Sequence, residues 1–430
     1  MQEVVKKKIN LENKYKFPEN LKIVNYCEKI IIIAVDIGNW IVLENEQQLS
    51  FFFLLKEYTI KESFQKYTGT KDDAISVLIQ IEDKKFDNLK TIKKSNNRIY
   101  IYLTNACNLL CPHCYMYAGK KNQNELNKNE IISFLRKFKL IGGEQVVFTG
   151  GEICTREDLI EIIDEVYELG YKIELLTNGT LWNYDLIKYV APKIEIVQVS
   201  IDGYNEESNS KIRGVGNFEK SLKSIEMFLK EKVKVRVAIT PYFDESLENN
   251  IDKYVLFINS LLEKFGENKF DIHLAGNLIA GRELKINEEI NLNYSMIIKE
   301  IYEKSNLKTR NINFIERHKR FELNDNCSIG NIYVSSCGDV FPCSRISEVS
   351  SIGNVRSKDF NILLDLLNNI RNRLNVNNLL PCCNCELKYI CGGGCRLQLI
   401  KGKRKSMQCT PQKKNSFYDL MIKYNKKMFQ

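Results

Sequence analysis

The chain has 430 residues, of which 44% are hydrophobic and only 7 are proline, so it can bury substantial cores and is not expected to be disordered. Its length suggests two or three domains. The net charge is +9, and residues 310–430 hold 20 lysines and arginines against 9 acidic residues. Such a basic segment can attract nucleic acid or an acidic peptide. A solvated lysine-rich surface is the simpler account, so nucleic acid is not an expected partner.

The start of the sequence predicts no signal peptide, because no cationic segment precedes an apolar stretch. The most apolar segment, 30–43, contains Asp36 and Asn39 and is too short to span a bilayer. A cytoplasmic protein without a membrane partner is therefore expected. Fourteen clustered cysteines then favour metal ligation over disulfides, while only three histidines argue against imidazole-rich zinc catalysis and serine–histidine hydrolysis.

Residues 1–95 are predicted to form a small separate module. The apolar runs 29–35 and 40–43, joined by residues 36–38, are typical of a β-hairpin. Helix-period segments follow at 47–57 and 72–81. Strands followed by short helices indicate a winged-helix-like module.

Residues 96–315 alternate between strand and helix patterns. The predicted strands are 98–104, 145–148, 172–176, 194–199, 234–239 and 270–274, and the predicted helices are 125–138, 155–169, 218–231 and 246–265. Six strands separated by helices imply parallel pairing with right-handed crossovers. The predicted fold class is therefore α/β, with a partial (β/α)6 barrel whose active site lies at the carboxyl ends of its strands.

Three cysteines follow the first barrel strand in the pattern Cys107-x3-Cys111-x2-Cys114. Three thiolates this close can hold three corners of a cubane iron–sulfur cluster and leave the fourth iron open to a ligand. An open iron can bind and reduce a substrate, whereas a four-thiolate site only passes electrons or holds structure. The missing fourth cysteine therefore indicates a reactive site.

Residues 316–430 are loop-rich, apart from a helical run at 360–374, and hold nine of the cysteines. Metals rather than apolar burial are expected to stabilise this region. Its array is Cys327-x10-Gly338-x4-Cys343, followed by Cys382-x2-Cys385-x5-Cys391-x3-Cys395-x13-Cys409. Structural zinc would explain one four-cysteine set. It would leave the three-cysteine loop unexplained.

The three-cysteine loop resembles the signature of the radical S-adenosylmethionine (radical SAM) enzymes, which use SAM and a [4Fe–4S] cluster. The resemblance continues in Thr149-Gly-Gly-Glu152 after the second strand and in further motifs at the ends of the third and fourth strands. It implies that Glu152 and the two glycines receive the amino group of SAM and that Ser200 and Arg213 contact its ribose and carboxylate. The implied cofactor residues are Gly150, Gly151, Glu152, Asn178, Ser200, Arg213, His113 and Tyr115, the last two beside the adenine.

The second array resembles the SPASM domain, the auxiliary-cluster region of radical SAM enzymes that modify peptides and proteins. The resemblance implies two further [4Fe–4S] clusters, three in all. The implied ligands are Cys327, Cys343 and Cys395 for the first auxiliary cluster, and Cys382, Cys385, Cys391 and Cys409 for the second. The first set lacks a fourth cysteine, so either one iron stays open to a substrate thiolate or Cys337 fills the gap.

The amino-terminal module resembles the leader-peptide recognition element, which binds a leader as an added strand. The order of the three regions matches the sactisynthases, so the expected function is a maturase that forms thioethers between cysteine sulfur and α-carbons of a ribosomal precursor peptide. Its expected partners are that peptide with its leader and an electron donor such as flavodoxin or ferredoxin. No residue stands out as a catalytic acid or base.

Two groups of alternatives stay open. The same radical chemistry could form a carbon–carbon crosslink or a β- or γ-carbon thioether, epimerise a residue, or oxidise a protein residue as in sulfatase maturation. The alternative without catalysis is a metal-stabilised binding protein that uses its basic third on nucleic acid.

Overall fold

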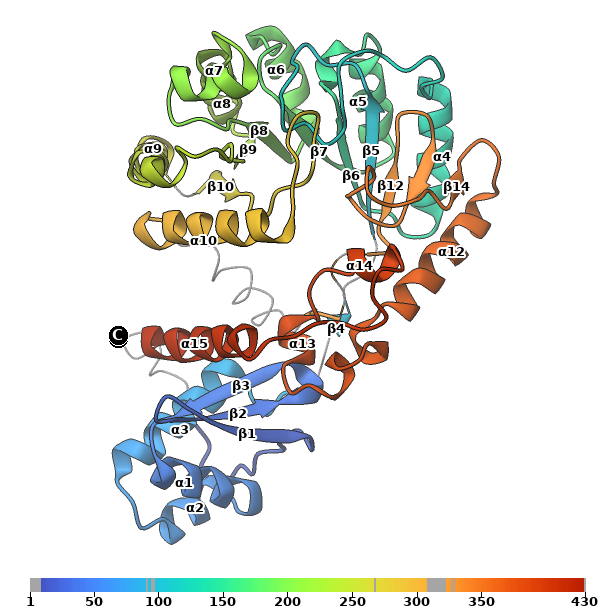
Figure 1. The fold of residues 1–430 in the computed structure, drawn as a ribbon. Coiled ribbons are helices and arrows are strands. Elements are labelled where there is room, and N and C mark those ends of the chain that lie inside the picture. Colours follow the sequence, from blue (N-terminus) through green and yellow to red (C-terminus); the bar gives the residue numbers. More distant parts are fainter. Residues whose placement is uncertain are drawn as a thin grey trace. The chain divides into compact units, whose positions relative to one another are not determined.

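The computed structural model describes residues 9–89, 92–93, 97–266, 268–307, 322–325, 327 and 329–428 (Figure 1). Their contacts divide the chain into two compact units. The first draws on residues 1–95, 309–329 and 371–430, and the second on residues 96–308 and 330–370. We call them the amino-terminal unit and the barrel unit. The predicted third domain, 316–430, is thus divided between the two units, and its predicted start near residue 315 lies outside the described residues.

The amino-terminal unit contains a three-stranded antiparallel sheet in the order β1-β2-β3. β1 (Leu21–Tyr26) and β2 (Lys29–Ala34) are joined by Cys27 and Glu28, whose φ angles of 47° and 58° suit a two-residue hairpin turn with the right-handed twist of the strands. A single 3₁₀ turn (Val35–Ile37) leads to β3 (Asn39–Leu43). The predicted hairpin is confirmed as β2–β3, and β1 was not predicted.

Both faces of this sheet are covered. Alternation along β2 turns Ile30 and Ile32 toward one cluster that includes Phe51, Phe52 and Val77, and turns Ile31 and Ile33 toward another. The second cluster is completed by residues of the carboxy-terminal segment, among them Leu387, Tyr418 and Met421. In the part of this unit that the structure describes, the helices are α1 (Glu46–Glu57), α2 (Ile60–Lys66), α3 (Lys71–Lys84), α13 (Lys388–Cys391), α14 (Leu397–Ile400) and α15 (Pro411–Met428), with 3₁₀ turns at Val376–Asn378 and Cys382–Asn384.

Carboxamide side chains close the outer edge of β3. The Val42 N–H donates to Oε1 of Gln80 at 2.9 Å, and Nε2 of the same side chain donates to the Val42 carbonyl at 2.7 Å. Asn425 of α15 donates to that carbonyl at 3.3 Å, and the Glu44 N–H donates to Oε1 of Gln48 at 2.9 Å. The three amide side chains are buried. They therefore satisfy, away from water, the backbone groups with which a further strand would pair.

Lys84, at the end of α3, is buried in the same unit. Its Nζ donates to Oδ1 of Asn425 at 3.2 Å and lies 5.4 Å from the ring centre of Trp40 and 5.6 Å from that of Tyr424. Burial lowers the pKa of Lys84 to about 7, against the opposing effect of Asp83. One more two-residue pairing, between β4 (Ile92–Lys93) and β11 (Glu322–Leu323), belongs to this unit.

The barrel unit is built on a nine-stranded sheet in the order β10-β9-β8-β7-β6-β5-β12-β13-β14. Its first six strands are parallel neighbours in chain order. They are β5 (Arg98–Thr104), β6 (Gln145–Gly150), β7 (Lys172–Thr177), β8 (Ile196–Ser200), β9 (Lys234–Ile239) and β10 (Phe270–Leu274). Within the described residues β10 and β5 do not pair, so the sheet is open, and the predicted six-stranded α/β architecture is confirmed.

Helices lie between and after these strands, and most of them bury apolar faces in one continuous core. They are α4 (Lys128–Leu140), α5 (Leu159–Glu168), α6 (Tyr184–Val190), α7 (Glu206–Arg213), α8 (Asn217–Lys230), α9 (Ile251–Phe265), α10 (Glu288–Lys304) and α12 (Phe360–Arg373), with 3₁₀ turns at Ile153–Thr155, Ala191–Lys193 and Glu248–Asn250. Among the helices in the described ranges, none has the length and apolar character needed to cross a membrane.

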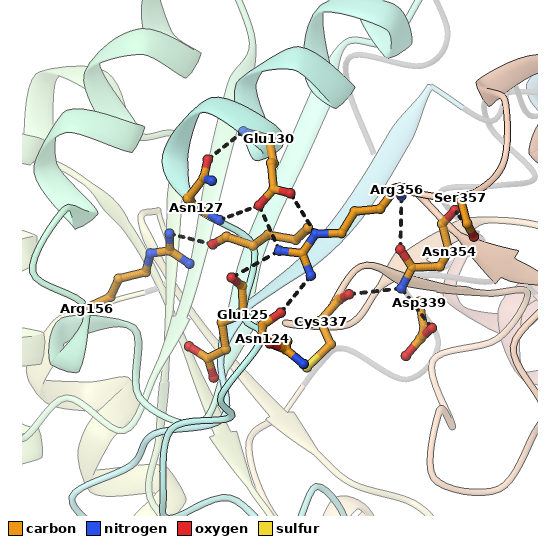
Figure 2. Close-up of polar contacts among 11 residues, drawn as sticks. Asn124, Glu125, Asn127, Glu130, Arg156, Cys337, Asp339, Asn354, Arg356 and Ser357 are labelled. Carbon is orange, nitrogen blue, oxygen red and sulfur yellow. Dashed lines mark hydrogen bonds and ion pairs between the residues drawn. The ribbon is translucent and has the colours of Figure 1, made fainter.

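Three short strands extend the sheet beyond β5. β12 (Ile332–Val334) pairs parallel to β5, and β13 (Asp339–Phe341) and β14 (Gly353–Asn354) follow antiparallel. Figure 2 shows how Arg356 fixes this extension: its Nε and Nη2 donate to the Glu130 carboxylate at 2.6 and 2.8 Å, and its Nη1 donates to the Asn124 carbonyl at 2.9 Å. Asn354 donates to the Cys337 carbonyl at 2.9 Å. The bidentate Arg356 thus holds one segment against the barrel. This segment carries Cys337 and Cys343, two of the cysteines considered as cluster ligands.

Replacing Lys84 tests the buried lysine. Between pH 7 and the ordinary pKa of 10.5, the unfolded chain holds a proton on Lys84 that the folded chain has lost. The free energy of unfolding of the wild type therefore rises with pH across this window, and in Lys84→Met this contribution is absent.

We expect the wild-type-minus-variant difference in unfolding free energy to rise by on the order of 1 kcal/mol per pH unit between pH 7.5 and 9.5. Urea titrations followed by circular dichroism measure it. The tyrosines and cysteines contribute equally to the pH dependence of both proteins. If the two curves of unfolding free energy against pH run parallel, the lowered pKa assigned to Lys84 is contradicted.

Candidate active site

A cavity of about 330 Å³ lies at the carboxyl ends of the parallel strands in the barrel unit. Its walls come from the segments that follow β5, β6, β7 and β8 and from the ends of β9 and β10, the edge at which parallel α/β sheets bind ligands. Ten of the residues singled out in the sequence line it: Cys107, Cys111, Cys114, His113, Tyr115, Gly150, Gly151, Asn178, Ser200 and Arg213.

The three-cysteine loop leaves β5 and returns to it. The Cys107 N–H donates to the Gly119 carbonyl at 3.0 Å, the Gly119 N–H donates to the Asn105 carbonyl at 2.9 Å, and the Cys114 N–H donates to the Cys111 carbonyl at 3.2 Å. All three thiols are free, and none is exposed. Burial raises the pKa of Cys107 to about 11, against a hydrogen bond from the Leu109 N–H. The loop therefore presents three half-buried or buried thiols to one cavity.

The glycine pair after β6 has no room for a side chain. A Cβ on Gly150, whose φ is +141°, would lie 2.4 Å from the Thr104 carbonyl oxygen, and one on Gly151 would lie 2.1 Å from that of Ala106. The Gly151 N–H also donates to the Thr104 carbonyl at 2.8 Å. The turn is thus packed directly on the residues that precede Cys107, so the end of β6 and the cysteine loop are placed as one piece.

Glu152 does not line the cavity and is fully buried. Its Oε1 accepts from Oγ1 of Thr177 at 2.7 Å and from the Cys154 N–H at 3.2 Å, and its Oε2 accepts from the Asn178 N–H at 2.7 Å. Burial raises the pKa of Glu152, and these hydrogen bonds oppose the rise. In this structure its carboxylate braces the end of β6 against the end of β7, and the cavity wall is formed by the glycine backbone.

Asn178, at the end of β7, joins that strand to the cysteine loop. Its Nδ2 donates to Oδ1 of Asn108 at 2.9 Å and lies 3.9 Å from Sγ of Cys107. Its Oδ1 accepts from the Thr180 N–H at 2.9 Å. The amide is therefore fixed beside the first thiol with its donor directed at the loop.

Asp202, which follows β8, connects several walls of the cavity. Its Oδ2 accepts from Nε of Arg213 at 2.6 Å and lies 3.2 Å from Nε2 of His113, and its Oδ1 accepts from the Thr240 N–H at 2.9 Å. Burial alone would raise the pKa of Asp202, but Arg213, His113 and the Thr240 N–H outweigh it and hold the pKa well below its usual range. The buried Asp202 carboxylate thus orients both the Arg213 guanidinium and the imidazole ring of His113 in the cysteine loop.

Arg213 and His113 both keep part of their bonding capacity for the cavity. The side chain of Arg213, at the end of α7, is only 11% exposed, and its charge opposes the effect of burial on the pKa of Cys111. Nδ1 of His113 is buried and has no hydrogen-bond partner among the described residues. A buried cation and an unpartnered ring nitrogen at one wall suit a ligand that carries both an anionic group and a polar one.

A second cysteine-lined cavity, of about 550 Å³, lies within the amino-terminal unit. Its walls include the four cysteines predicted to bind the second auxiliary cluster: Cys382, Cys385, Cys391 and Cys409. Three lysines, Lys388, Lys413 and Lys414, also line it. The other predicted set is distributed differently, since Cys327 and Cys395 belong to this unit and Cys343 belongs to the barrel unit.

Part of the first cavity's wall is formed by residues that the sequence did not single out. Polar side chains of Gln198, Thr240, His273 and Asn277 line it, as do Leu278 and Ile279 beyond β10. Their sequence signal is only their place near the ends of parallel strands. That signal becomes usable once the strand order is known.

The family model of the radical SAM superfamily matches residues 101–258. This match covers the end of β5, the strands β6 to β9, the cysteine loop, the glycine turn and Arg213. The match identifies a radical SAM domain within residues 101–258. Enzymes of this superfamily combine SAM with a [4Fe–4S] cluster.

The curated relatives include a heme synthase and a bacteriocin biosynthesis protein. The AdoMet-dependent heme synthase of Methanosarcina barkeri is 26% identical over 318 residues, which are 68% of this chain and 89% of that protein. The antilisterial bacteriocin subtilosin biosynthesis protein AlbA of Bacillus subtilis is 27% identical over 278 residues, or 59% of this chain. This chain spans only 56% of the length of AlbA.

Solved structures show the same fold. The crystal structure of Streptococcus suis SuiB aligns with a TM-score of 0.52 at 19% identity and covers 91% of this chain and 97% of that one. SuiB bound to the precursor peptide SuiA aligns over the same shares with a TM-score of 0.50 and 19% identity. At this identity the likeness concerns the fold alone.

The residues of this radical SAM site fit the two groups that the superfamily uses. Among the described residues, no three cysteine, histidine or acidic side chains converge closely enough to hold a single ion. A single zinc would need its sulfurs at about 2.3 Å from one point. Thiols spread around a cavity match a cluster of several irons better. The partner-free His113 nitrogen and the buried Arg213 suit the polar and carboxylate groups of SAM.

Asp202→Asn tests the role of the buried carboxylate. The change keeps the size of the side chain but leaves Arg213 as a buried cation without its counter-charge, so we expect Arg213 and His113 to lose their orientation.

We expect the affinity of the iron-loaded variant for SAM to fall about 10-fold or more, measured by equilibrium dialysis under anaerobic conditions. Asp185→Asn, at an exposed carboxylate of α6, serves as the control. Wild-type affinity in a folded Asp202→Asn protein would contradict the role assigned to this carboxylate.

Proposed function

We propose that this radical SAM enzyme is a peptide maturase whose SAM-binding [4Fe–4S] cluster is held by Cys107, Cys111 and Cys114. The observation that carries the proposal is the convergence of these three thiols on one cavity together with the glycine turn and the buried Arg213. When bound, the cluster and SAM supply a 5′-deoxyadenosyl radical that removes a hydrogen atom from an unactivated carbon. The chain's own residues position the reactants and exclude water.

The residues around the cavity divide the task of holding SAM. Arg213, oriented by Asp202, supplies positive charge for the SAM carboxylate, and Ser200 supplies a hydroxyl for the ribose. The backbone of Gly150 and Gly151 forms the wall beside the amino group, and Glu152 acts through that wall because its carboxylate is engaged by protein donors. Asn178, His113 and Tyr115 complete the pocket.

Two auxiliary [4Fe–4S] clusters are part of the proposal. For the second, the support is that its four predicted cysteines line one cavity. The lysines in the same wall would balance part of the negative charge of a thiolate-bound cluster. Cys327, Cys343 and Cys395 are proposed for the first auxiliary cluster, with an iron left open or filled by Cys337. A flavodoxin or ferredoxin is proposed as the source of electrons.

The proposed substrate is a precursor peptide, and the proposed product is a thioether between a cysteine sulfur and an α-carbon. The support is the likeness to AlbA and the fold that this chain shares with SuiB over 91% of its length. Forming such a bridge removes one hydrogen from carbon and one from sulfur. The auxiliary clusters would receive the electron that remains when the carbon–sulfur bond closes.

The leader of that peptide is proposed to bind the amino-terminal sheet as an added strand. The β3 edge is occupied by amide side chains, so the β1 edge is proposed as the docking edge. Because Val42 turns its backbone to Gln80, its partner Ile31 turns toward Val24 of β1. The backbone groups of Ile23 and Asn25 then face outward. An extended peptide can pair with them.

The heme synthase relative supports a second candidate function, in which the substrate is a porphyrin rather than a peptide. That alignment spans 89% of the relative. It leaves about a third of this chain unmatched. Peptide modification remains the proposal. The two functions can be told apart because the peptide changes mass in the first and the porphyrin changes mass in the second.

The function is tested with anaerobically reconstituted protein, SAM and dithionite, and with candidate precursor peptides from open reading frames near the gene. We expect 5′-deoxyadenosine from the wild type and none from the Cys107/Cys111/Cys114→Ala variant. We expect the peptide to lose about two hydrogen masses per bridge and to lose deuterium placed at the bridged α-carbon. Deuterium retained in a crosslinked peptide would reject the α-carbon assignment. Turnover of a porphyrin with an unchanged peptide would favour the second candidate.

Asn25→Pro tests the docking edge. Proline removes an outward N–H but spares the β1–β2 ladder, because edge strands tolerate proline where the N–H faces solvent. We expect a fluorescein-labelled synthetic precursor to bind about 10-fold more weakly, by fluorescence anisotropy. Gln80→Ala, which opens the β3 edge, should leave the affinity unchanged. Tighter binding by Gln80→Ala, or unchanged binding by Asn25→Pro, would indicate that the leader docks at the β3 edge instead of the β1 edge.

A further inference from the structure

A short segment after β10 holds the back of the three-cysteine loop. We call residues 281–283 the strap. The Arg282 N–H donates to the Cys114 carbonyl at 3.2 Å, and the Glu283 N–H donates to the Pro112 carbonyl at 2.7 Å. The Arg282 guanidinium donates from Nη1 to the Cys111 carbonyl at 2.9 Å and from Nη2 to the Ala118 carbonyl. Four carbonyl groups of the loop thus take their donors from two consecutive residues.

The contact between strap and loop leaves no space for a side chain. A Cβ on Gly281 would lie 2.4 Å from the carbonyl oxygen of His113 and 2.5 Å from its carbonyl carbon. The hydroxyl of Tyr117 donates to the Gly281 carbonyl at 3.2 Å. Backbone therefore lies directly against backbone at His113, one of the two residues that separate the last two cysteines.

The strap is itself anchored on both sides. The Gly281 N–H donates to the Leu284 carbonyl at 3.0 Å, and the Leu278 N–H donates to Oδ1 of Asn291 in α10 at 2.8 Å. Leu278 and Leu284 are buried and line the cavity, whereas Arg282 does not. Arg282 therefore reaches the site only through the cysteine loop.

We infer that Arg282 is a positioning residue for the iron–sulfur cluster, holding the three-cysteine loop in the form that presents its thiols to the cavity. The inference rests on the proposed assignment of these thiols as cluster ligands. Buried carbonyl groups need donors, and a planar guanidinium can serve two of them at once, whereas an ammonium lacks that geometry. Partners behind the ligands commonly fix ligand orientation and so metal affinity. The Arg282 charge also lies close to a loop that carries an anionic cluster.

The test compares Arg282→Ala and Arg282→Lys with Glu283→Ala. The control removes an exposed side chain from the same strap and keeps the backbone bond to Pro112. The first measurement is the release of iron to a chelator after anaerobic reconstitution, with the Cys107/Cys111/Cys114→Ala variant reporting the iron held elsewhere. We expect both Arg282 variants to release the iron of this site about 10-fold to 100-fold more readily and the control to match the wild type.

The second measurement is hydrogen exchange over residues 107–119 in iron-free protein. We expect faster exchange there in both Arg282 variants, with exchange in α4 and α5 unchanged, because general destabilisation would affect the whole unit. Gly281→Ala, which pushes the strap off the loop, should give the same pattern. This measurement reports on the strap even if the variants bind no iron.

Wild-type iron retention with wild-type exchange in Arg282→Ala would overturn the inference. Wild-type behaviour of Arg282→Lys would also overturn it, since charge alone would then suffice. Failure of the proposed function looks different. In that case the triple cysteine variant would hold as much iron as the wild type, whatever the strap variants show.

Discussion

A positive charge buried at the mouth of the barrel needs a fixed negative partner, and Asp202 is that partner. Its carboxylate follows β8, yet it receives hydrogen bonds from α7 through Arg213 and from the start of the next loop through Thr240, and it lies beside His113 of the cysteine loop. Removing a charge from such a group would leave its neighbour desolvated and uncompensated. The relative placement of these elements is therefore fixed by electrostatics as well as by apolar packing.

The glycine turn and the strap act on the same loop by steric means. Gly150 and Gly151 let the end of β6 lie against the residues before Cys107, and Gly281 lets the strap lie against His113. Polar side chains fill the remaining gaps: Asn178 from β7 and Arg282 from beyond β10. The three thiols thus sit on a loop that is held by the glycine turn, by Asn178 and by the strap, although the loop has little regular structure of its own.

The regular part of the barrel could be predicted because its strands contain apolar residues in a repeating pattern. β5, β9 and β10 have the predicted bounds, since Ile99 and Ile101 or Val235 and Val237 mark a buried face clearly. β1 escaped prediction because its residues are largely exposed. The extension β12 to β14 escaped because strands of two or three residues carry too little periodicity to detect.

The candidate site could be predicted as a set of residues but not as a geometry. The spacing of Cys107, Cys111 and Cys114 is local and survives any fold. The direction of the Glu152 carboxylate depends on Thr177 and the Asn178 N–H, which only the packing of β7 against β6 brings near. Arg282 left no sequence signal, because an arginine that bonds to backbone carbonyls can contact any residue type.

The strap couples two properties that are usually discussed separately. Within seven residues, the chain both lines the cavity, at Leu278 and Leu284, and holds the back of the cysteine loop, at Arg282. A ligand that orders this wall also orders the loop, and the free energies of the two processes must then be linked reciprocally. Occupancy of the cavity by a small molecule would make the metal harder to extract, and by the same amount a loaded metal site would tighten the hold on that molecule.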